Sequence, residues 1–273
     1  MDALMKDSTA ATTPRFFLPA ISLCWRELVR FYRQRSRIIG VVGSPLVFWF
    51  LIGSGLGGSF RHPSGSSDVN YVEYFFPGTV VLIMLFTSIF STISIIEDRR
   101  EGFLQSVIVA PVARASIALG KILGGTILSL LQAILLLVIT PFIGISLNLL
   151  SFAIVFMTTF IIAFGLTGLG FLIAWRMDST QGFHTIMNLF LIPLWLLSGA
   201  LFPISGAAGW LSKIMMANPL TYGVAALRQG LYLDGHVATQ ELASLPVCIF
   251  ITAAFAIITF LSSAFTVRQP GKN

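Results

Sequence analysis

Six long uncharged runs are the feature that most limits what this chain can fold into. Each has at least 20 consecutive residues without Asp, Glu, Lys or Arg; they are 38–60, 75–96, 122–147, 149–175, 183–202 and 245–267. A helix of roughly 20 apolar residues crosses a hydrocarbon core about 30 Å thick. A Lys or Arg at the bilayer centre costs about 2.5–3.5 kcal/mol on insertion scales, so their absence favours membrane insertion. We therefore predict an all-α integral membrane protein with six transmembrane helices.

The amino-acid composition agrees with a membrane protein. The sequence is 56% hydrophobic and 10% charged, whereas soluble domains are roughly 25% charged. The formal net charge of +6 does not predict a nucleic-acid partner, because the basic residues lie beside apolar runs and form no separate basic domain. Glycine and proline interrupt two runs, 38–60 and 183–202, whose backbone then depends on neighbouring helices for its hydrogen bonds.

The region before the first run divides into a tail and an amphipathic helix. Residues 1–15 are polar and lack an apolar core, which predicts a disordered cytoplasmic tail rather than a cleavable signal peptide. Residues 16–37 have helical periodicity. One face carries Phe17, Ile21, Cys24, Trp25, Leu28 and Tyr32, and the opposite face carries Ser22, Arg26, Arg30, Arg33 and Arg37. We expect this helix to lie in the membrane interface; a helix packed on a soluble domain is the alternative.

The distribution of Lys and Arg between alternate loops predicts the orientation. With the N-terminus in the cytoplasm, all but three of the 17 basic residues fall on the cytoplasmic side. The three outer ones are Arg61, Lys213 and Arg228. Short cytoplasmic loops carry the excess of Lys and Arg in membrane proteins. We therefore predict a multi-pass protein with both termini in the cytoplasm, ending in a short tail at 268–273.

The segment 203–244, between the last two runs, does not have the pattern of a simple loop. Two apolar stretches, 210–216 and 222–233, are each too short to span a membrane, and Asn218 and Pro219 separate them. We predict two short helices that dip into the outer leaflet or cap an outer vestibule, where neighbouring protein protects them. An eight-span protein is the competing interpretation.

The region 97–114, between the second and third runs, combines a charge cluster with a short helix. The apolar side of that helix consists of Phe103, Leu104, Val107 and Ile108, and Pro111 ends it. A rigid element of this kind can dock on a soluble partner. A solvated loop that only sets the topology explains the residues equally well.

The same region resembles a known family. Arg100-Glu101-Gly102 with Leu104, followed by Val109-Ala110-Pro111-Val112-Ala113-Arg114, is similar to the signature of ABC-2-type permeases, the membrane subunits of bacterial ATP-binding-cassette exporters. The entry to the second run at 75–79, the amphipathic helix and the Asn218-Pro219 pair are also similar. The resemblance covers nearly the whole chain and points to the drug and lipo-oligosaccharide export branch.

The resemblance implies a fold, partners and a site. It implies that 38–267 is a six-span domain in a homodimeric permease of the bacterial inner membrane, bound to two copies of an ABC ATPase subunit. ATP and Mg²⁺ would bind that subunit, and the permease would need no cofactor. The 97–114 loop would couple the two. Its contact residues would be Glu97, Asp98, Arg99, Arg100, Glu101, Gly102, Phe103, Leu104 and Gln105.

Two positions in the coupling loop depart from the family pattern. Phe103 stands where relatives often have Thr, and Gln105 stands where they frequently have Glu. We therefore expect a hydrophobic socket on the ATPase for Phe103. Arg176 and Asp178, at the next cytoplasmic turn, are candidates for a second ATPase contact, with a simple surface pair as the alternative.

The sequence contains no nucleotide-binding or metal-binding motif. Ahead of Gly120-Lys121, Ala115 stands where a phosphate-binding loop needs its first glycine, and Ile122 stands where Mg²⁺ needs a hydroxyl. The three histidines and two cysteines lack the spacing of metal ligands. ATP must therefore bind another subunit, and we expect no metal site.

Polar residues inside the predicted spans are candidates for a substrate path. They are Gln132, Thr158, Thr159, Asn188 and Ser198. Hydrogen bonding between helices is their alternative use, and the glycines Gly165, Gly168 and Gly170 favour close helix packing.

The function we expect is that of an exporter permease rather than an enzyme. It would move an amphipathic substrate (a drug, a lipid or a lipid-linked glycan) outward, driven by ATP hydrolysis on a separate subunit. An ion-coupled secondary transporter and a membrane-embedded enzyme are the alternatives. The first usually keeps ionisable residues inside its spans and the second needs convergent catalytic groups, and the six runs supply neither.

Overall fold

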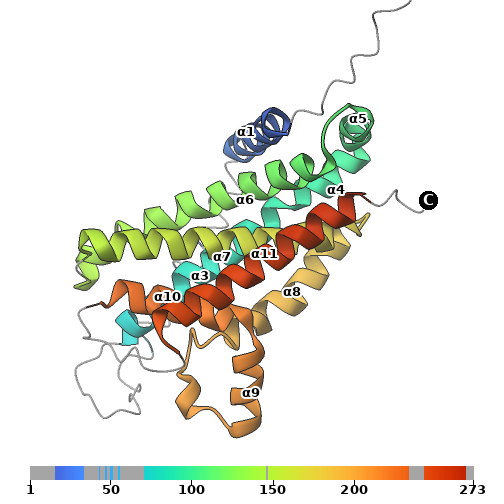
Figure 1. The fold of residues 1–273 in the computed structure, drawn as a ribbon. Helices are drawn as coiled ribbons and strands as arrows, with labels where there is room; N and C mark the ends of the chain where they lie inside the picture. The colour runs from blue at the N-terminus through green and yellow to red at the C-terminus, as the bar shows by residue number, and fades with distance from the viewer. Residues whose placement is uncertain are drawn as a thin grey trace, which may run out of the picture.

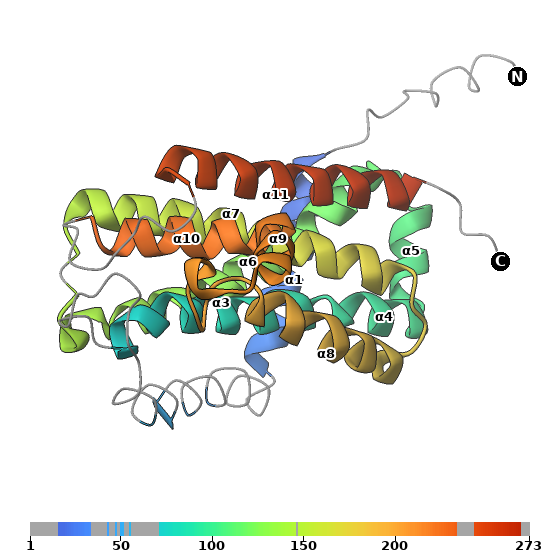
Figure 2. The same ribbon diagram turned by 90° about the horizontal axis from the view of Figure 1, so that it is seen from below.

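The computed structural model describes residues 16–33, 71–145, 147–233 and 243–268, with five single positions, 43, 47, 50, 51 and 55, between the first two ranges. Helices and connecting turns make up this described part of the chain, and no strand occurs in it. The long helices lie side by side in one bundle (Figures 1 and 2). The predicted all-α class is confirmed for these residues.

Four predicted spans are confirmed as helices long and apolar enough to cross a membrane. They are Glu73–Arg100, Arg114–Leu137, Leu149–Trp175 and Leu245–Val267. The first combines α3, Tyr71–Ser91, with α4, Ile93–Arg100, and the others are α6, Arg114–Leu137, α7, Leu149–Trp175, and α11, Leu245–Arg268. The third predicted run, 122–147, extends past α6, because Pro141 lies in a separate 3₁₀ turn, η1, Thr140–Ile143.

The remaining two predicted spans are not established. The run 38–60 lies almost wholly outside the described residues, although its five described positions are helical. The run 183–202 corresponds to α8, Thr180–Leu196, whose 17 residues are followed by a turn at Gly199 with φ +77°. A helix of this length extends only about 25 Å, less than the roughly 30 Å of a hydrocarbon core. Six crossings therefore stay a prediction.

The bundle packs around α3 and α4, and glycines allow the closest approaches. Phe75, Ile83 and Ile95 along this central helix are fully buried. A Cβ placed on Gly168 would lie 2.8 Å from Thr259 Oγ1 of α11, and one placed on Gly170 would lie 2.9 Å from Thr92 Oγ1. Gly165 is similarly close to α11. The predicted packing role of these glycines is confirmed, since small residues let helix backbones approach in membranes.

The amphipathic helix α1, Phe17–Arg33, crosses α6 and turns most of its rings outward. Gly120 and Gly124 of α6 allow this close crossing. A Cβ placed on Gly120 would lie 2.6 Å from the backbone oxygen of Ala20, and one placed on Gly124 would lie 2.7 Å from the Cβ of Glu27. Phe17, Ile21, Trp25 and Tyr32 are 62–79% exposed. Cys24, predicted on the same face, is buried at the edge of the contact with α6. The exposed rings form the face that we predict to enter the membrane interface.

The two short helices predicted between the last runs are confirmed. They are α9, Gly209–Ala217, and α10, Pro219–Leu231, preceded by the 3₁₀ turn η2, Ile204–Gly206. The Asn218 side chain accepts a hydrogen bond from the backbone N–H of Leu220 at 3.0 Å and caps α10, whose first residue is proline. Packing against α7 and α11 buries most of α10.

Arg228, on α10, is buried inside the bundle. The distribution of basic residues in the sequence assigned it to the outer side with Arg61 and Lys213. It is 4% exposed, and its guanidinium carbon lies 4.2 Å from the ring centre of Tyr74. Its Nη2 also donates to the carbonyl of Gly199 at 3.0 Å. Tyr74 donates to the same carbonyl at 3.2 Å, so these two side chains hold the turn after α8 against α3.

Candidate functional site

The region predicted as a coupling loop is mostly helical. Residues 97–100 form the last turn of α4, and α5, Phe103–Val109, begins directly after Gly102 (Figure 1). Gly102 has φ +76°, a conformation that costs other residues about 1–2 kcal/mol. The glycine in the Arg100-Glu101-Gly102 pattern is therefore explained by the sharp reversal between α4 and α5.

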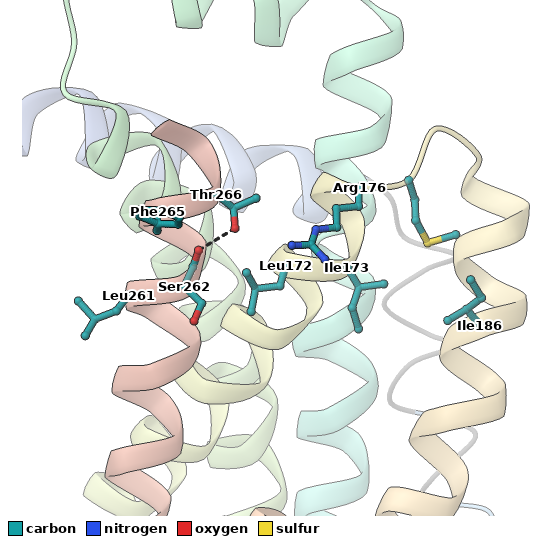
Figure 3. A pocket seen from close by; sticks show the side chains of 9 residues that line it. Leu172, Ile173, Arg176, Ile186, Leu261, Ser262, Phe265 and Thr266 are labelled. Carbon is teal, nitrogen blue, oxygen red and sulfur yellow. Dashed lines mark hydrogen bonds between the residues drawn. The ribbon is translucent and has the colours of Figure 1, made fainter. Parts of the chain in front are cut away.

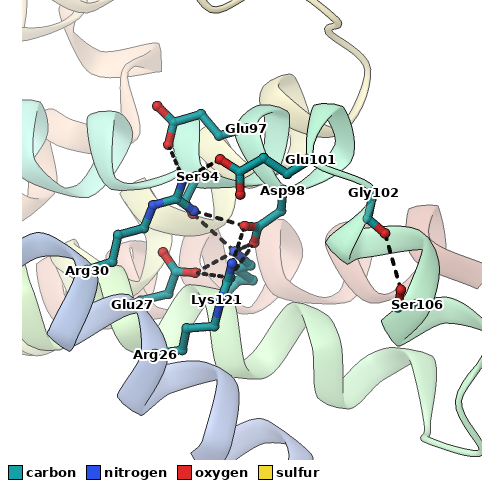
Figure 4. Close-up of polar contacts among 10 residues, drawn as sticks. All are labelled: Arg26, Glu27, Arg30, Ser94, Glu97, Asp98, Glu101, Gly102, Ser106 and Lys121. Atoms are coloured by element: carbon teal, nitrogen blue, oxygen red, sulfur yellow. Dashed lines mark hydrogen bonds and ion pairs between the residues drawn. The ribbon is translucent and has the colours of Figure 1, made fainter.

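Three charged side chains, Glu27, Asp98 and Lys121, meet in the interior between α1, α4 and α6 (Figure 4). The Nζ of Lys121 donates to both carboxylates and, at 3.2 Å, to the hydroxyl of Ser94. All three charged side chains are at most 5% exposed. Removing an ion from water costs several kcal/mol unless partners replace the water, so each of these charges depends on the others.

Arg26 and Arg30 complete this cluster on its solvent side. Arg26 binds both oxygens of Asp98 at 2.7 Å, and Arg30 binds Asp98 Oδ1 at 2.9 Å. Arg30 also pairs with Glu97 at 2.8 Å. Two-point guanidinium–carboxylate pairs fix geometry as well as charge. We call Arg26, Glu27, Arg30, Asp98 and Lys121 the ion network; it joins α1 to α4 and α6.

The nine residues predicted to contact an ATPase have different environments. Asp98 is fully buried and Leu104 is 3% exposed. Arg100, Glu101 and Gln105 are exposed, and the other four are partly buried. The ATPase contacts stay a prediction, but Asp98 and Leu104 are placed to support the surface from inside rather than to touch a partner.

The structure places the ring of Phe103 against its own chain. The Arg26 guanidinium lies 3.7 Å from the ring centre of Phe103, which is only partly exposed. A cation–π contact within the chain covers one face of the ring, and the expected ATPase socket for Phe103 stays a prediction. The outward apolar residues of α5 are instead Ile108, 37% exposed, and Val109, 85% exposed.

The second predicted contact, the turn after α7, lies directly beside α4. Arg99 Nη1 pairs with Asp178 Oδ1 at 3.0 Å, and its Nη2 donates to the carbonyl of Trp175. Arg100 Nε donates to the carbonyl of Asp178 at 2.9 Å. The two predicted regions thus form one surface at this end of the bundle. Arg176 is not part of it and lines a cavity between α7, α8 and α11.

Sequence reasoning missed Glu27 and Lys121 as parts of the site. Glu27 is the one acidic residue in a helix whose other charges are arginines, and Lys121 lies two turns inside α6. Glu27 directly follows Arg26 and reads as its local partner, and Lys121 reads as an isolated charge. A single acid among arginines and a lysine between apolar residues are the signal that could have predicted a buried pair.

The five residues predicted to line a substrate path are not gathered in one place. Gln132 on α6, Thr158 and Thr159 on α7, and Ser198 after α8 are buried, whereas Asn188 on α8 is exposed. Thr159 and Ser198 donate to carbonyls of their own helix, three or four residues earlier. Gln132 accepts from Thr87 of α3. These bonds fit the helix-packing interpretation better, and the substrate path stays a prediction.

Cavities open on the bundle surface, and two of them contain residues predicted from the sequence. One, of about 760 Å³, lies between α7, α8 and α11 and includes Arg176 (Figure 3). The other, of about 610 Å³, lies between α1 and α6 and has Gln132 as a polar residue in a largely apolar wall. Within the ranges that the structure describes, no group of three His, Cys, Asp or Glu side chains is placed to hold a metal ion.

Comparison with known proteins identifies a family. The sequence profile of the ABC-2 type transporter family matches residues 20–232. This match covers α1 from Ala20 onward, the α4–α5 region with the ion network, and the helices through α10.

Individual relatives are named as transport permeases, and their sequence identity to this chain is low. A protein of Cyanophora paradoxa named as the transport permease ycf38 is 26% identical over 231 residues, which are 84% of this chain and 79% of the relative. A daunorubicin resistance ABC transporter permease protein, DrrB1 of Streptomyces coeruleorubidus, is 23% identical over 75% of this chain and 72% of its own length. The protein of Escherichia coli K12 named as the multidrug ABC transporter permease YbhR is 26% identical over 57% of this chain, but that match spans only 42% of YbhR.

Proposed function

Because the chain belongs to the ABC-2 type transporter family, a family of membrane permeases, we propose that it is the permease subunit of an exporter driven by a separate ATPase. The observation that carries this proposal is the exposed end of α5, which follows the central helix directly after Gly102, while the ion network ties that helix to α1 and α6. An amphipathic substrate is supported by two relatives whose names refer to multidrug transport and daunorubicin resistance.

The proposed complex has two permease chains and two ATPase subunits. The family supports association with an ABC ATPase. ATP and Mg²⁺ bind the ATPase in this proposal, because the permease sequence lacks the glycine-rich phosphate loop. The second permease is a copy of the same chain.

The geometry supports a transmission mechanism in which α5 contacts the ATPase. The helix Glu73–Arg100 has 28 residues, about 42 Å, and runs from the α4–α5 end through the bundle core. A movement of α5 at the ATPase surface would shift α4 along this axis. Because the ion network ties α4 to α1 and α6, these three helices would move as one unit.

The chain positions of the basic residues support an orientation with the α4–α5 end in the cytoplasm of a bacterial inner membrane. Arg99 and Arg114 lie at helix ends beside α5, and Arg176 and Arg268 lie at the ends of α7 and α11 on the same side (Figure 1). An excess of Lys and Arg marks the cytoplasmic side. Both termini are cytoplasmic in this proposal.

The orientation predicts opposite labelling of two exposed serines. In a chain without Cys24 and Cys248, Ser205→Cys, in η2, should react with an impermeant thiol reagent added to intact cells. Ser106→Cys, on α5, should react only after the cells are made permeable. Both serines are exposed, so accessibility is matched. Labelling of Ser106→Cys in intact cells would contradict the proposed orientation and place the α4–α5 end outside.

Two changes at the α4–α5 reversal should uncouple ATP hydrolysis without preventing insertion. Glu101 is 60% exposed and lies 3.6 Å from Arg30, so Glu101→Gln should cost the fold at most about 1 kcal/mol. Gly102→Ala should strain the reversal by about 1–2 kcal/mol and turn α5. We expect both to lower the stimulation of ATP hydrolysis by substrate in reconstituted vesicles, with daunorubicin as the first substrate tested.

The control for this experiment is Gln181→Ala, at an exposed position of α8 on the same end. It should leave both insertion and stimulation unchanged. If complexes with Glu101→Gln or Gly102→Ala show the same substrate stimulation of ATP hydrolysis as the unaltered complex, the α4–α5 region is not the coupling element.

The alternative of an ion-coupled transporter gains little from the buried charges. Glu27, Asp98 and Lys121 are ionisable and buried, but they lie at one end of the bundle beside α5 (Figure 4). Ion and proton relays are expected along the pathway through the membrane. The network fits a structural joint better than a relay.

A further inference from the structure

The cavity between α7, α8 and α11 combines one cation with hydroxyl groups and apolar walls. Arg176, Ser262 and Thr266 line it, and Figure 3 shows the Arg176 guanidinium extending over Leu172 toward α11. Its apolar wall consists of Leu172, Ile186, Leu261 and Phe265. A charged group at one edge of an apolar cavity is the pattern of a site for an amphipathic ion.

Arg176 has its charge available for a ligand. The nearest acidic residue in the sequence is Asp178, and its carboxylate is paired with Arg99 of α4 at 3.0 Å. In the part of the chain that the structure describes, the Arg176 side chain takes part in no ion pair or hydrogen bond. A guanidinium without a carboxylate partner beside an apolar cavity favours an anion from outside the chain.

The walls of the cavity continue into a surface that faces away from the bundle. Leu261 and Phe265 are 59% and 62% exposed on α11. An acyl chain can pack along such a surface by van der Waals contact, whereas a small inorganic anion has no apolar part to place there. A neutral apolar ligand would leave Arg176 without a counter-ion. The two halves of the site therefore require one molecule with an anionic head and an apolar tail.

We infer that this cavity binds an anionic phospholipid of the cytoplasmic leaflet. The phosphate lies on Arg176 and the hydroxyl of Ser262, and an acyl chain follows Leu261 and Phe265. Basic pockets between transmembrane helices on the cytoplasmic side bind anionic headgroups. The assignment of the leaflet rests on the proposed orientation of the permease, because Arg176 lies at the same end as α5.

Lipid retention by the purified full-length chain tests this site. The protein in detergent is titrated with phosphatidylglycerol or phosphatidylcholine, and native mass spectrometry counts the lipids that stay bound. We expect one phosphatidylglycerol to bind more tightly than phosphatidylcholine. Arg176→Gln should weaken that binding about five-fold, the ratio that roughly 1 kcal/mol per basic contact corresponds to. Phe265→Ala should weaken both lipids, because it removes acyl contact and leaves the charge.

A matched control separates this site from general attraction of lipid to positive charge. Lys213→Gln removes an exposed basic residue on α9 that lines neither cavity and should leave phosphatidylglycerol binding unchanged. Equal losses in Lys213→Gln and Arg176→Gln, or no preference for the anionic lipid, would overturn the inference. Displacement by glycerol phosphate as effective as that by phosphatidylglycerol would show that no tail is recognised. A shift from dimer to monomer in Arg176→Gln would assign the cavity to a second copy instead.

The result does not depend on the ATPase. Binding is measured on the isolated permease, so a failed coupling experiment with Glu101→Gln leaves this inference standing. Conversely, absence of a lipid site leaves the transmission role of α5 untouched.

Discussion

Replacing Lys121 with methionine should lower the free energy of unfolding by about 3–5 kcal/mol, the usual cost of removing one partner from a buried ion pair. The side chains of Glu27 and Asp98 are 5% and 0% exposed, and Lys121 is the cation shared by both. Asp98 keeps Arg26 and Arg30, but Glu27 would keep only Arg26, at 3.7 Å. The midpoint temperature of thermal unfolding, measured on the detergent-solubilised chain, should fall by on the order of 10 °C.

Two further variants show whether charge or volume causes the loss. Lys213→Met makes the same substitution at an exposed position at the far end of the bundle and should stay within about 0.5 kcal/mol of the unaltered chain. Glu27→Gln combined with Lys121→Met removes one charge of each sign and should recover more than half of the loss. If Lys121→Met unfolds like Lys213→Met, the ion network does not hold α1 to the bundle.

Val109→Asp should weaken binding of the ATPase subunit about thirty-fold without unfolding the permease. Val109 is 85% exposed at the tip of α5, so its substitution removes little from the fold. If α5 enters the ATPase, an aspartate there places a charge in an apolar contact, and central contacts of this kind contribute about 2 kcal/mol or more. Titration of the ATPase subunit onto permease in lipid nanodiscs measures the dissociation constant.

Acidic charge at this end could by itself repel the ATPase, and one control addresses this. Gln181→Asp adds the same charge at an exposed position at the start of α8, close to the turn that contacts Arg99 and Arg100. It should change binding by less than three-fold, since rim charges contribute little to affinity at physiological salt. Similar weakening by Gln181→Asp and Val109→Asp would show that charge, and not α5, decides the association.

A thirty-fold loss with Val109→Asp would also revise the expectation for Phe103. Because Phe103 is apolar where relatives often have Thr, and lies on the apolar side of the short helix, the sequence points to Phe103 as the residue that enters the partner. Its ring is instead covered by Arg26 at 3.7 Å, and the outward position falls to Val109, six residues later. Periodicity predicts that a helix has an apolar side but does not tell which part of that side the rest of the chain will cover.

Much of the fold could be predicted because it depends on local composition. Long apolar runs form helices in lipid, where every backbone group must be bonded within the segment. Asn218-Pro219 marks the start of α10 because a capping side chain and a fixed φ act on neighbouring residues. The length of α8 was overestimated, since the turn at Gly199 is held by Tyr74 and Arg228, which are distant in sequence.

The sequence by itself determined that long uncharged runs form apolar helices, four of them long enough to cross a membrane, and that a short helix separates the second run from the third. Those properties belong to single segments. Only the tertiary structure decided that Glu27, Asp98 and Lys121 form one cluster, whose first and last members are 94 positions apart in the sequence. A buried charge is stable only when an opposite charge meets it, and which residues meet depends on how α1 lies across the glycines of α6.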